Sequence, residues 1–127
     1  MSRKIITMIV TLSFLLLLSL VEQAAVLRIT NRALERTQEI FADIREEDLK
    51  NGLKKTHDLD QSWDEMAVWL EILVDHRATD DVRYALSRLI AALEEEDSAM
   101  AMVYAGELEG AIEHVFERQA LSVENIL

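Results

Sequence analysis

The sequence predicts an all-α protein in which an N-terminal transmembrane helix continues into an antiparallel bundle of about three to four helices. The chain of 127 residues has no Pro and only three Gly, so few residues interrupt helices. Apolar residues recur at three- and four-residue spacing, and no segment shows the sustained period of two that is typical of strands. Residues 5–21 are uncharged and predominantly apolar, which is typical of a membrane span.

The predicted span, Ile5–Val21, sets the domain organisation. A helix of this length covers roughly 26 Å, close to the ~30 Å hydrocarbon core of a bilayer, and Ala24–Leu27 would complete it. Arg3 and Lys4 favour a cytoplasmic N-terminus by the positive-inside rule. We therefore expect residues 1–27 to form a basic start and single-pass signal-anchor in the cell membrane, and residues 28–127 to form an extracytoplasmic helical domain.

A cleaved signal peptide is the alternative to an anchor. The apolar run is longer than the usual apolar region of about 7–15 residues. Cleavage after Ala24 or Ala25 would place Glu22 or Gln23 at a position that requires a small residue. Both observations favour retention, and a secreted helical protein stays open as the second possibility.

The apolar spacing indicates where the helices lie. The first helix should continue past the membrane surface as far as the charged run 45–48, and a second should run from about Glu46 to Asp75, with a weak first half near His57. Residues 66–74, MAVWLEILV, are apolar almost all round apart from Glu71. A helix without a clear polar face is usually surrounded by neighbours, so we expect this segment at the centre of the core.

Capping signals predict the two later helices. Residues 76–78 read as a tight connection, after which Thr79, Asp80 and Asp81 would begin the third helix. The acidic run 94–97 reads as a corner, and Asp97 or Ser98 would cap the fourth helix. Because the connections are short, consecutive helices should be antiparallel neighbours.

Charge and composition exclude several classes of function. The formal net charge is −11, and all 24 acidic residues lie beyond residue 21. Such a surface repels phosphate backbones, so we expect no nucleic-acid partner. The chain has no Cys, which excludes disulfides and thiolate metal sites.

No constellation of residues predicts catalysis. None of His57, His76 and His114 stands in a Glu-x-x-His or His-Glu-x-x-His pattern. Nucleophile motifs and glycine-rich phosphate loops are absent, so we predict no enzyme, no cofactor and no metal site. The acidic runs 58–64 and 94–97 lack the glycine and ligand spacing of a calcium loop. A ligand- or ion-binding sensor that uses this acidic surface remains the alternative function.

A face of small residues on the fourth predicted helix is the most specific candidate site. Gly106 and Gly110 lie opposite the apolar face, together with Ala99 and Val103. Glycine in a helix costs about 1 kcal/mol relative to Ala, and a small-residue groove could offset this cost by letting another helix approach closely. The alternative is that an exposed face simply tolerates the two glycines.

With the helices assigned, one pattern of spaced residues runs along most of the chain. It consists of Trp63 and Trp69, residues 73–76 with Asp75 and His76, residues 80–82 and 86–89, and the end of the chain, residues 121–127, with Asn125. In this pattern the chain resembles the family called domain of unknown function 4363, a group of short, single-span bacterial membrane proteins.

The resemblance implies a membrane-anchored extracytoplasmic domain and supplies no catalytic residues. We expect Trp63 and Trp69 to be packing residues, and Ile126 and Leu127 to pack on the bundle or to dock on a partner. The expected role is an accessory or interaction protein. Its partner would be another membrane protein or a second copy, because tethering raises effective concentration at the membrane.

Overall fold

Four helices account for nearly all of the computed structural model, which describes residues 2–73 and 75–126, with side chains for residues 2–72 and 75–118. Their bounds are α1 (Arg3–Arg45), α2 (Leu49–Leu73), α3 (His76–Glu94) and α4 (Ser98–Ile126). No strand occurs in these described residues. The predicted all-α class with a long first helix is confirmed.

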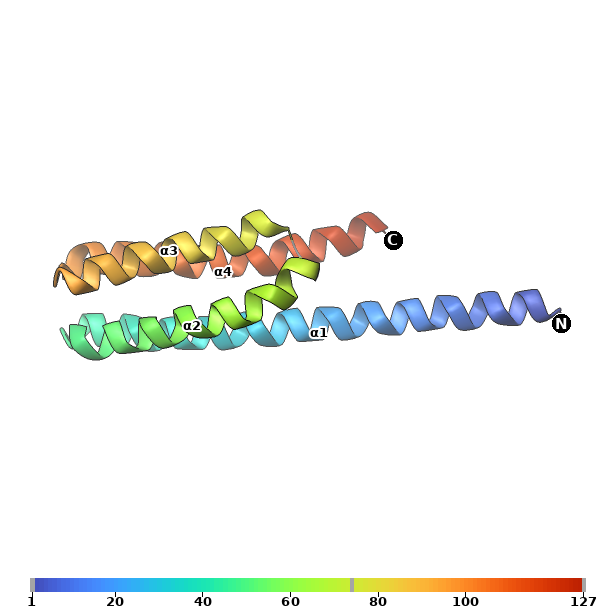
Figure 1. Cartoon of the computed structure of the whole chain (residues 1–127), viewed down its shortest axis with the longest axis horizontal. Coiled ribbons are helices and arrows are strands. Elements are labelled where there is room, and N and C mark those ends of the chain that lie inside the picture. Colours follow the sequence, from blue (N-terminus) through green and yellow to red (C-terminus); the bar gives the residue numbers. More distant parts are fainter. Residues whose placement is uncertain (1, 74, 127) are drawn as a thin grey trace.

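The first helix is much longer than the bundle. Its 43 residues extend over roughly 64 Å. Ser2 begins the helix, and its side chain accepts a hydrogen bond from the backbone N–H of Ile5. The turns of α1 nearest the N-terminus project beyond the other helices, of which α4 reaches furthest along it, whereas the half from Val26 onward lines the bundle (Figure 1). The prediction that this helix continues past residue 27 is therefore confirmed.

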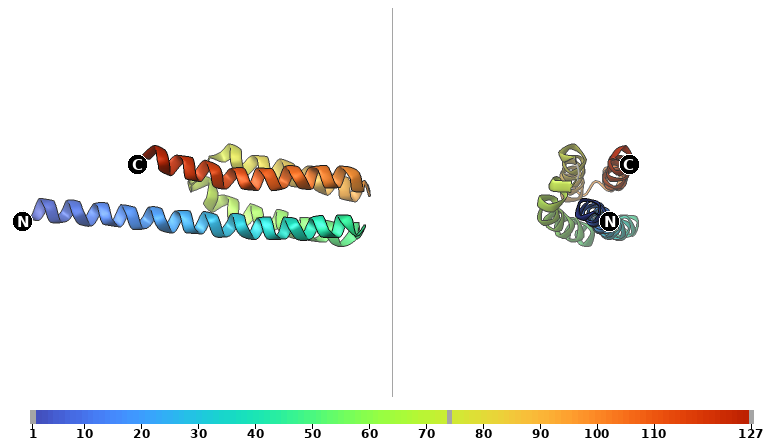
Figure 2. Two further views of the ribbon diagram at one scale, coloured as in Figure 1. Left: turned by 180° about the vertical axis from the view of Figure 1, so that it is seen from behind. Right: turned by 90° about the vertical axis from the view of Figure 1, so that its right-hand side faces the viewer.

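The bundle has an up-down-up-down arrangement in which each helix packs against two others. The helix α1 contacts α2 and α4, and α3 contacts the same two helices from the opposite side. Figure 2 shows the four helices around a common centre when they are viewed along the bundle. The largest fully buried side chains come from all four helices: Val26, Thr30, Ile40, Leu59, Trp63, Leu70, Val82, Leu86, Leu89, Leu108, Ile112 and Val115.

The α1–α2 and α3–α4 corners have the same backbone structure. In the first corner Glu47 adopts a left-handed conformation with φ of 58°. Its N–H donates to the Ile44 carbonyl at 3.1 Å, and the N–H of Asp48 donates to the Asp43 carbonyl at 2.9 Å. This pair of hydrogen bonds is the Schellman motif that ends many helices. Asp48 then begins α2, because its carboxylate accepts from the N–H of Asn51 at 3.3 Å.

The second corner repeats every one of these features. Glu96 has φ of 57°, and Asp97 both closes α3 and caps α4, with its carboxylate 3.1 Å from the N–H of Met100. The prediction of Asp97 as a cap is therefore confirmed. Both corners lie at the end of the bundle that is distant from the N-terminus (Figure 1). We call this the distal end and the opposite one the proximal end.

The matching corners belong to an internal repeat of two helical hairpins. Buried positions of α1–α2 recur in α3–α4 at one constant spacing, and the match continues for several turns on each side of the corner. The pairs are Thr30 with Thr79, Ala33 with Val82, Thr37 with Leu86, Ile40 with Leu89, Ile44 with Leu93, Thr56 with Ala105, Leu59 with Leu108, and Trp63 with Ile112. The bundle is thus two similar hairpins packed face to face.

The predicted boundary between the second and third helices was wrong. Residues 76–78 form the first turn of α3 and are not a connection, and the N-cap is Asp75, whose carboxylate accepts from the N–H of Arg77 at 3.1 Å. Thr79 is fully buried one turn inside the helix. The other end of α2 also differs, since the helix starts at Leu49 and continues through His57 without a break.

The prediction for residues 66–74 was also wrong. Among residues 66–72 only one stripe is buried, formed by Ala67 and Leu70, and the side chain of Leu73 lies outside the described residues. Val68, Trp69 and Ile72 are exposed, because α2 has neighbours on only two sides and the outer side of its last turns faces away from both. Trp69 is therefore not the packing residue that we expected. Val74 lies outside the described residues.

Candidate functional site

An exposed apolar patch at the proximal end of α2 is the candidate functional site. It consists of Val68, Trp69 and Ile72, which we call the α2 patch. Their exposed fractions are 62%, 70% and 73%, which exceed those of all other large apolar side chains from Val26 onward in the described part of the chain. Large exposed apolar groups that lie together on a surface mark a site of contact with something other than water.

The antiparallel register of α1 and α2 determines the height of the patch along the bundle. Lys55 Nζ lies 2.9 Å from Asp43 Oδ2, and Arg36 Nη1 donates to Ser62 Oγ at 2.9 Å. Each further residue toward the end of α2 therefore corresponds to one residue toward the start of α1. By this register Ile72 lies near the level of Val26, about 8 Å along the axis from the end of the apolar segment.

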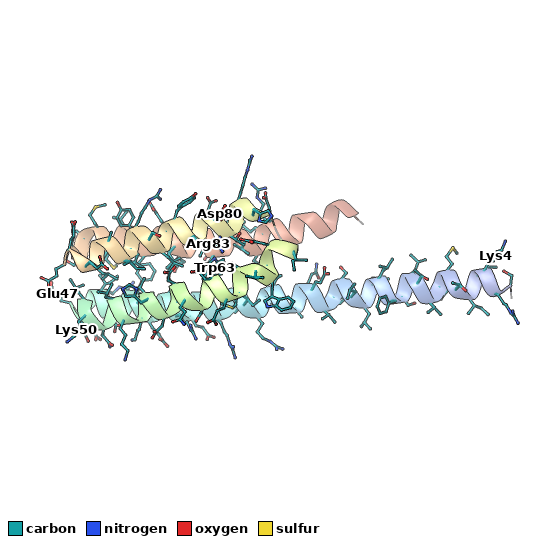
Figure 3. All side chains as sticks on the ribbon, viewed as in Figure 1. Lys4, Glu47, Lys50, Trp63, Asp80 and Arg83 are labelled. Atoms are coloured by element: carbon teal, nitrogen blue, oxygen red, sulfur yellow. The ribbon has the colours of Figure 1, made fainter. Side chains whose placement is uncertain are left out.

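Charges are distributed unequally between the two ends of the bundle. The distal end carries seven exposed acidic residues in the two corners: Glu46, Glu47, Asp48, Glu94, Glu95, Glu96 and Asp97. Near the α2 patch, Arg28 and Arg32 of α1 and Arg77 of α3 are exposed. Figure 3 shows Glu47 and Lys50 at the distal end and Lys4 at the free end of α1.

A cluster of charged residues links α2 to α3 next to the α2 patch, on its distal side. The Arg83 guanidinium lies 3.3 Å from carboxylate oxygens of Asp64, Glu71 and Asp80. The Glu71 side chain is only partly exposed, and this ion pair explains how a carboxylate is accommodated within an apolar stretch. Such pairs near the surface contribute little stability each, and the cluster mainly orients its members.

A second ion pair connects α1 to α2 toward the distal end. Asp43 is a buried residue, and its carboxylate is bound by Lys55 at 2.9 Å. The hydrogen bond to Asp43 raises the pKa of Lys55, with the charge of that carboxylate acting in the same direction. At the equivalent positions of the second hairpin the chain has Ala92 and Tyr104, so this pair is a feature of the first hairpin alone.

The remaining residues on which the family resemblance rests lie in different environments. Trp63 is fully buried, as predicted, and its indole N–H donates to the Thr79 carbonyl at 3.3 Å. Asp75 caps α3 and also accepts from the Arg118 guanidinium at 3.3 Å. His76 is exposed, with Nδ1 3.9 Å from a Glu71 oxygen. The side chain of Asn125 lies outside the described residues, as do those of Ile126 and Leu127.

The predicted small-residue face lies on the outside of the bundle. Ala99, Val103, Gly106 and Gly110 are all exposed on α4. A Cβ atom added at Gly106 or Gly110 would meet no neighbouring atom within 4 Å. Neither glycine is therefore required for packing between the helices of this bundle. Whether another helix binds this face stays a prediction.

Possible binding sites for ions and small molecules are limited within the described residues. No three side chains of His, Cys, Asp or Glu there are grouped so that they could hold a metal ion. An open groove of about 450 Å³ lies between α1 and α2. Its lining is charged and polar, formed by Arg36, Glu39, Lys55, Asp58, Gln61, Ser62 and Glu65. A groove with both signs of charge and no apolar wall does not select one class of ligand.

Sequence reasoning missed the α2 patch because it interpreted apolar residues on every side of a helix as burial in protein. The missed signal is the position of the segment, directly before the corner at the proximal end. An apolar outer face at this height can be covered by a membrane instead of by another helix.

The comparison with protein families gave one match. The family model described as domain of unknown function (DUF4363) matches residues 20–126, which covers the whole bundle but little of the apolar segment. No match was found among curated proteins, and none was found among solved structures.

Proposed function

This chain belongs to the family of the domain of unknown function DUF4363, and from that premise we propose that it is a membrane-anchored accessory or interaction protein. In this proposal α1 crosses the cell membrane once. The N-terminus is cytoplasmic, and the bundle is held on the extracytoplasmic side as a module for contact with other membrane proteins.

The exposure of the first half of α1 carries the proposal. Thirteen large apolar side chains between Ile5 and Val21 are exposed. Moving one such side chain from water into an apolar environment yields roughly 1.5–3 kcal/mol. Because these side chains are 43–62% exposed, roughly half of that value applies to each. The sum over thirteen is then comparable to the total stability of about 5–15 kcal/mol that is typical of a domain. This exposure supports an apolar environment for the segment, and one helix of this length and composition fits a single membrane span.

The continuity of α1 supports a defined position for the bundle. The same helix that carries the apolar segment enters the core at Val26 and continues to Arg45 without a break. The bundle is thus joined to the span by helix and not by a flexible linker, which favours a fixed distance from the membrane.

Labelling of engineered cysteines tests the topology, because the chain has no Cys of its own. Ser2→Cys and Ser87→Cys place single thiols at exposed positions at the start of α1 and on α3. In intact cells a membrane-impermeant maleimide should label the Ser87→Cys variant and leave the Ser2→Cys variant unlabelled until lysis. Labelling of both variants in intact cells, or of neither, would exclude the proposed orientation.

Crosslinking in native membranes followed by mass spectrometry tests the role as an interaction module. We expect crosslinked species that contain a second membrane protein or a second copy. Monomer alone, under conditions that capture established complexes, would contradict the role. The intact mass from the membrane fraction separates the anchored protein from the cleaved, secreted alternative, since cleavage would remove about 24 residues.

The sensor that uses the acidic surface remains the alternative function from the sequence. Thermal unfolding at increasing calcium concentrations distinguishes the sensor from the interaction module, because a ligand of the native state raises Tm by mass action. An increase in Tm at millimolar calcium would favour the sensor over the interaction module.

A further inference from the structure

We infer that the α2 patch, Val68, Trp69 and Ile72, inserts into the headgroup layer of the same phospholipid bilayer that α1 spans. This inference rests on the proposed anchoring by residues 5–21 and extends it. It gives the bundle a second attachment to the membrane, on a different helix from the first.

The height of the patch agrees with such an insertion. The hydrocarbon core of a bilayer is about 30 Å thick, and the headgroup layers raise the total to about 40–45 Å, so each layer is roughly 5–8 Å deep. Ile72 lies about 8 Å beyond Val21 along the bundle, and Trp69 lies about one turn further. The apolar segment is about 4 Å shorter than the core, so the hydrocarbon extends past Val21 to about Ala24. Measured from that boundary, Ile72 lies at about 3 Å and Trp69 at about 8 Å, which is within the headgroup layer.

The side chains of the patch suit this layer. Tryptophan is enriched at membrane–water interfaces, where its ring contacts apolar groups and its N–H stays hydrated. Trp69 is exposed on the outer side of α2, and Val68 and Ile72 flank it at neighbouring helical positions. In water these three groups would remain as exposed as the side chains of the span itself.

The charge distribution favours the same orientation. Around the proximal end Arg28, Arg32 and Arg77 are exposed and can contact lipid phosphates, whereas the exposed Asp75 is paired with Arg118. The seven exposed acidic residues of the two corners lie at the distal end, away from anionic headgroups. A bundle with the α2 patch on the bilayer therefore separates its acidic corners from the membrane. Two attachments on α1 and α2 would also restrict the tilt of the bundle.

Quenching of tryptophan fluorescence by brominated lipids tests the inference on the full chain. The protein is reconstituted in vesicles of phosphatidylcholine and phosphatidylglycerol, with bromine either near the headgroup end or near the methyl end of the acyl chains. Trp63 is fully buried in the bundle, so the difference between the natural chain and Trp69→Phe reports Trp69 alone. We expect Trp69 emission to be blue-shifted and quenched most by bromine near the headgroup end.

Two further variants on the Trp69→Phe background serve as controls. Tyr84→Trp places a probe at an exposed position of α3 in the middle of the bundle, and its emission should not be quenched. Phe14→Trp places a probe within the span, and its emission should be quenched by bromine near the methyl end of the lipids.

The outcomes separate the inference from the proposed anchoring. If Phe14→Trp is quenched but Trp69 is not, the inference is wrong and the anchoring stands. If Phe14→Trp is also unquenched, the anchoring fails and the inference fails with it. Blue-shifted but unquenched Trp69 emission that depends on protein concentration would show that a second copy covers the patch, which also overturns the inference.

Discussion

The indole N–H of Trp63 donates to the Thr79 carbonyl across the interface between α2 and α3, at 3.3 Å. Both residues are fully buried. Thr79 belongs to the first turns of α3, so this bond joins the first hairpin to the second at the point where the chain passes between them. The residue that repeats Trp63 in the second hairpin is Ile112, which has no such donor.

The first prediction concerns the contribution of Trp63 to stability. Trp63→Ala should lower the free energy of unfolding by about 3–5 kcal/mol, because it leaves a cavity in the core. Trp63→Phe keeps an aromatic ring in the core and should lower the free energy of unfolding by less. About 1 kcal/mol of that loss should come from the missing hydrogen bond to Thr79. Denaturant unfolding in detergent, followed by circular dichroism, measures both values. Trp69→Ala, at an exposed position, is the control, and an equal loss there would contradict the assignment of the core.

The helical class of the fold could be predicted because it depends on local spacing and composition. The boundary between α2 and α3 could not. Asp75 and the run Thr79–Asp81 both have the residue types of a helix start, and local sequence does not rank them. In the structure the bond from Trp63 requires a buried Thr79 carbonyl, and the earlier start at His76 supplies it. The observed start of α3 is thus the one that occurs together with this contact between α2 and α3.

The internal repeat is detectable only from the structure, for a related reason. The two hairpins share burial positions but few residue types, as in Thr37 with Leu86 or Trp63 with Ile112. What the paired positions share is burial at the same place on the helix, so the side chains can diverge while the arrangement of the helices remains.

The second prediction uses the repeat to test the buried Asp43–Lys55 pair. Lys55→Ala should lower Tm, because it leaves the Asp43 carboxylate buried without its cation. The double variant Asp43→Ala/Lys55→Tyr installs the residues that the second hairpin has at these positions. It should recover the Tm lost by Lys55→Ala, which thermal unfolding near neutral pH measures. A double variant that is less stable than Lys55→Ala would show that the two hairpins are not equivalent there.

The pKa of Lys55 adds a pH dependence to this prediction. The bond to Asp43 raises the pKa of Lys55 in the folded state, so the contribution from protonated Lys55 is fully present below the unfolded pKa of Lys. The contribution is lost as pH rises through the higher folded value. The difference in Tm between the natural chain and Lys55→Ala should therefore shrink in the alkaline range, as pH rises through the folded pKa of Lys55.

The third prediction concerns Asp60 on α2. Burial raises the pKa of its carboxyl, and the nearby Asp64 carboxylate acts in the same direction, against His57 and Arg83. The folded state therefore binds the proton more tightly than the unfolded chain does. The resulting stabilisation is present at low pH and is lost as pH rises through the unfolded value and then the raised folded one.

Asp60→Asn should for this reason raise stability at pH 7 and leave it nearly unchanged at pH 3. The expected gain is below about 1 kcal/mol, because the group is only partly buried. Asp58→Asn, at an exposed position of the same helix, is the matched control. Thermal unfolding at both pH values measures the effect, and a gain of equal size for both variants would point to overall charge instead of burial.

The fourth prediction concerns the left-handed residues of the two corners, Glu47 and Glu96. A residue other than glycine pays roughly 1–2 kcal/mol for this backbone conformation. Glycine avoids that cost but loses about 0.5–1 kcal/mol of chain entropy. Each Glu→Gly substitution should therefore raise the free energy of unfolding by about 0.5–1 kcal/mol. Denaturant unfolding of the single and double variants measures the gain and its additivity.

Controls at the first corner separate backbone strain from charge. Glu47→Gln removes the charge and keeps the strained backbone, so it should give a smaller gain than Glu47→Gly. Glu46→Gly, at a residue with φ of −81°, should destabilise the protein because no strain is relieved there. Equal gains from Gln and Gly at position 47 would mean that repulsion among the acids is the larger effect.

The last prediction tests the small-residue face of α4. Because the space around Gly106 and Gly110 is open, Gly106→Ala and Gly110→Ala should each raise stability by about 1 kcal/mol through helix propensity alone. If the face receives another helix, the double Leu variant should also reduce crosslinked complexes in membranes, since larger side chains prevent close approach. Ser87→Leu, which adds the same apolar bulk to the exposed face of α3, should leave these complexes unchanged. Stabilised Leu variants with undiminished crosslinking would show that the face contacts only water.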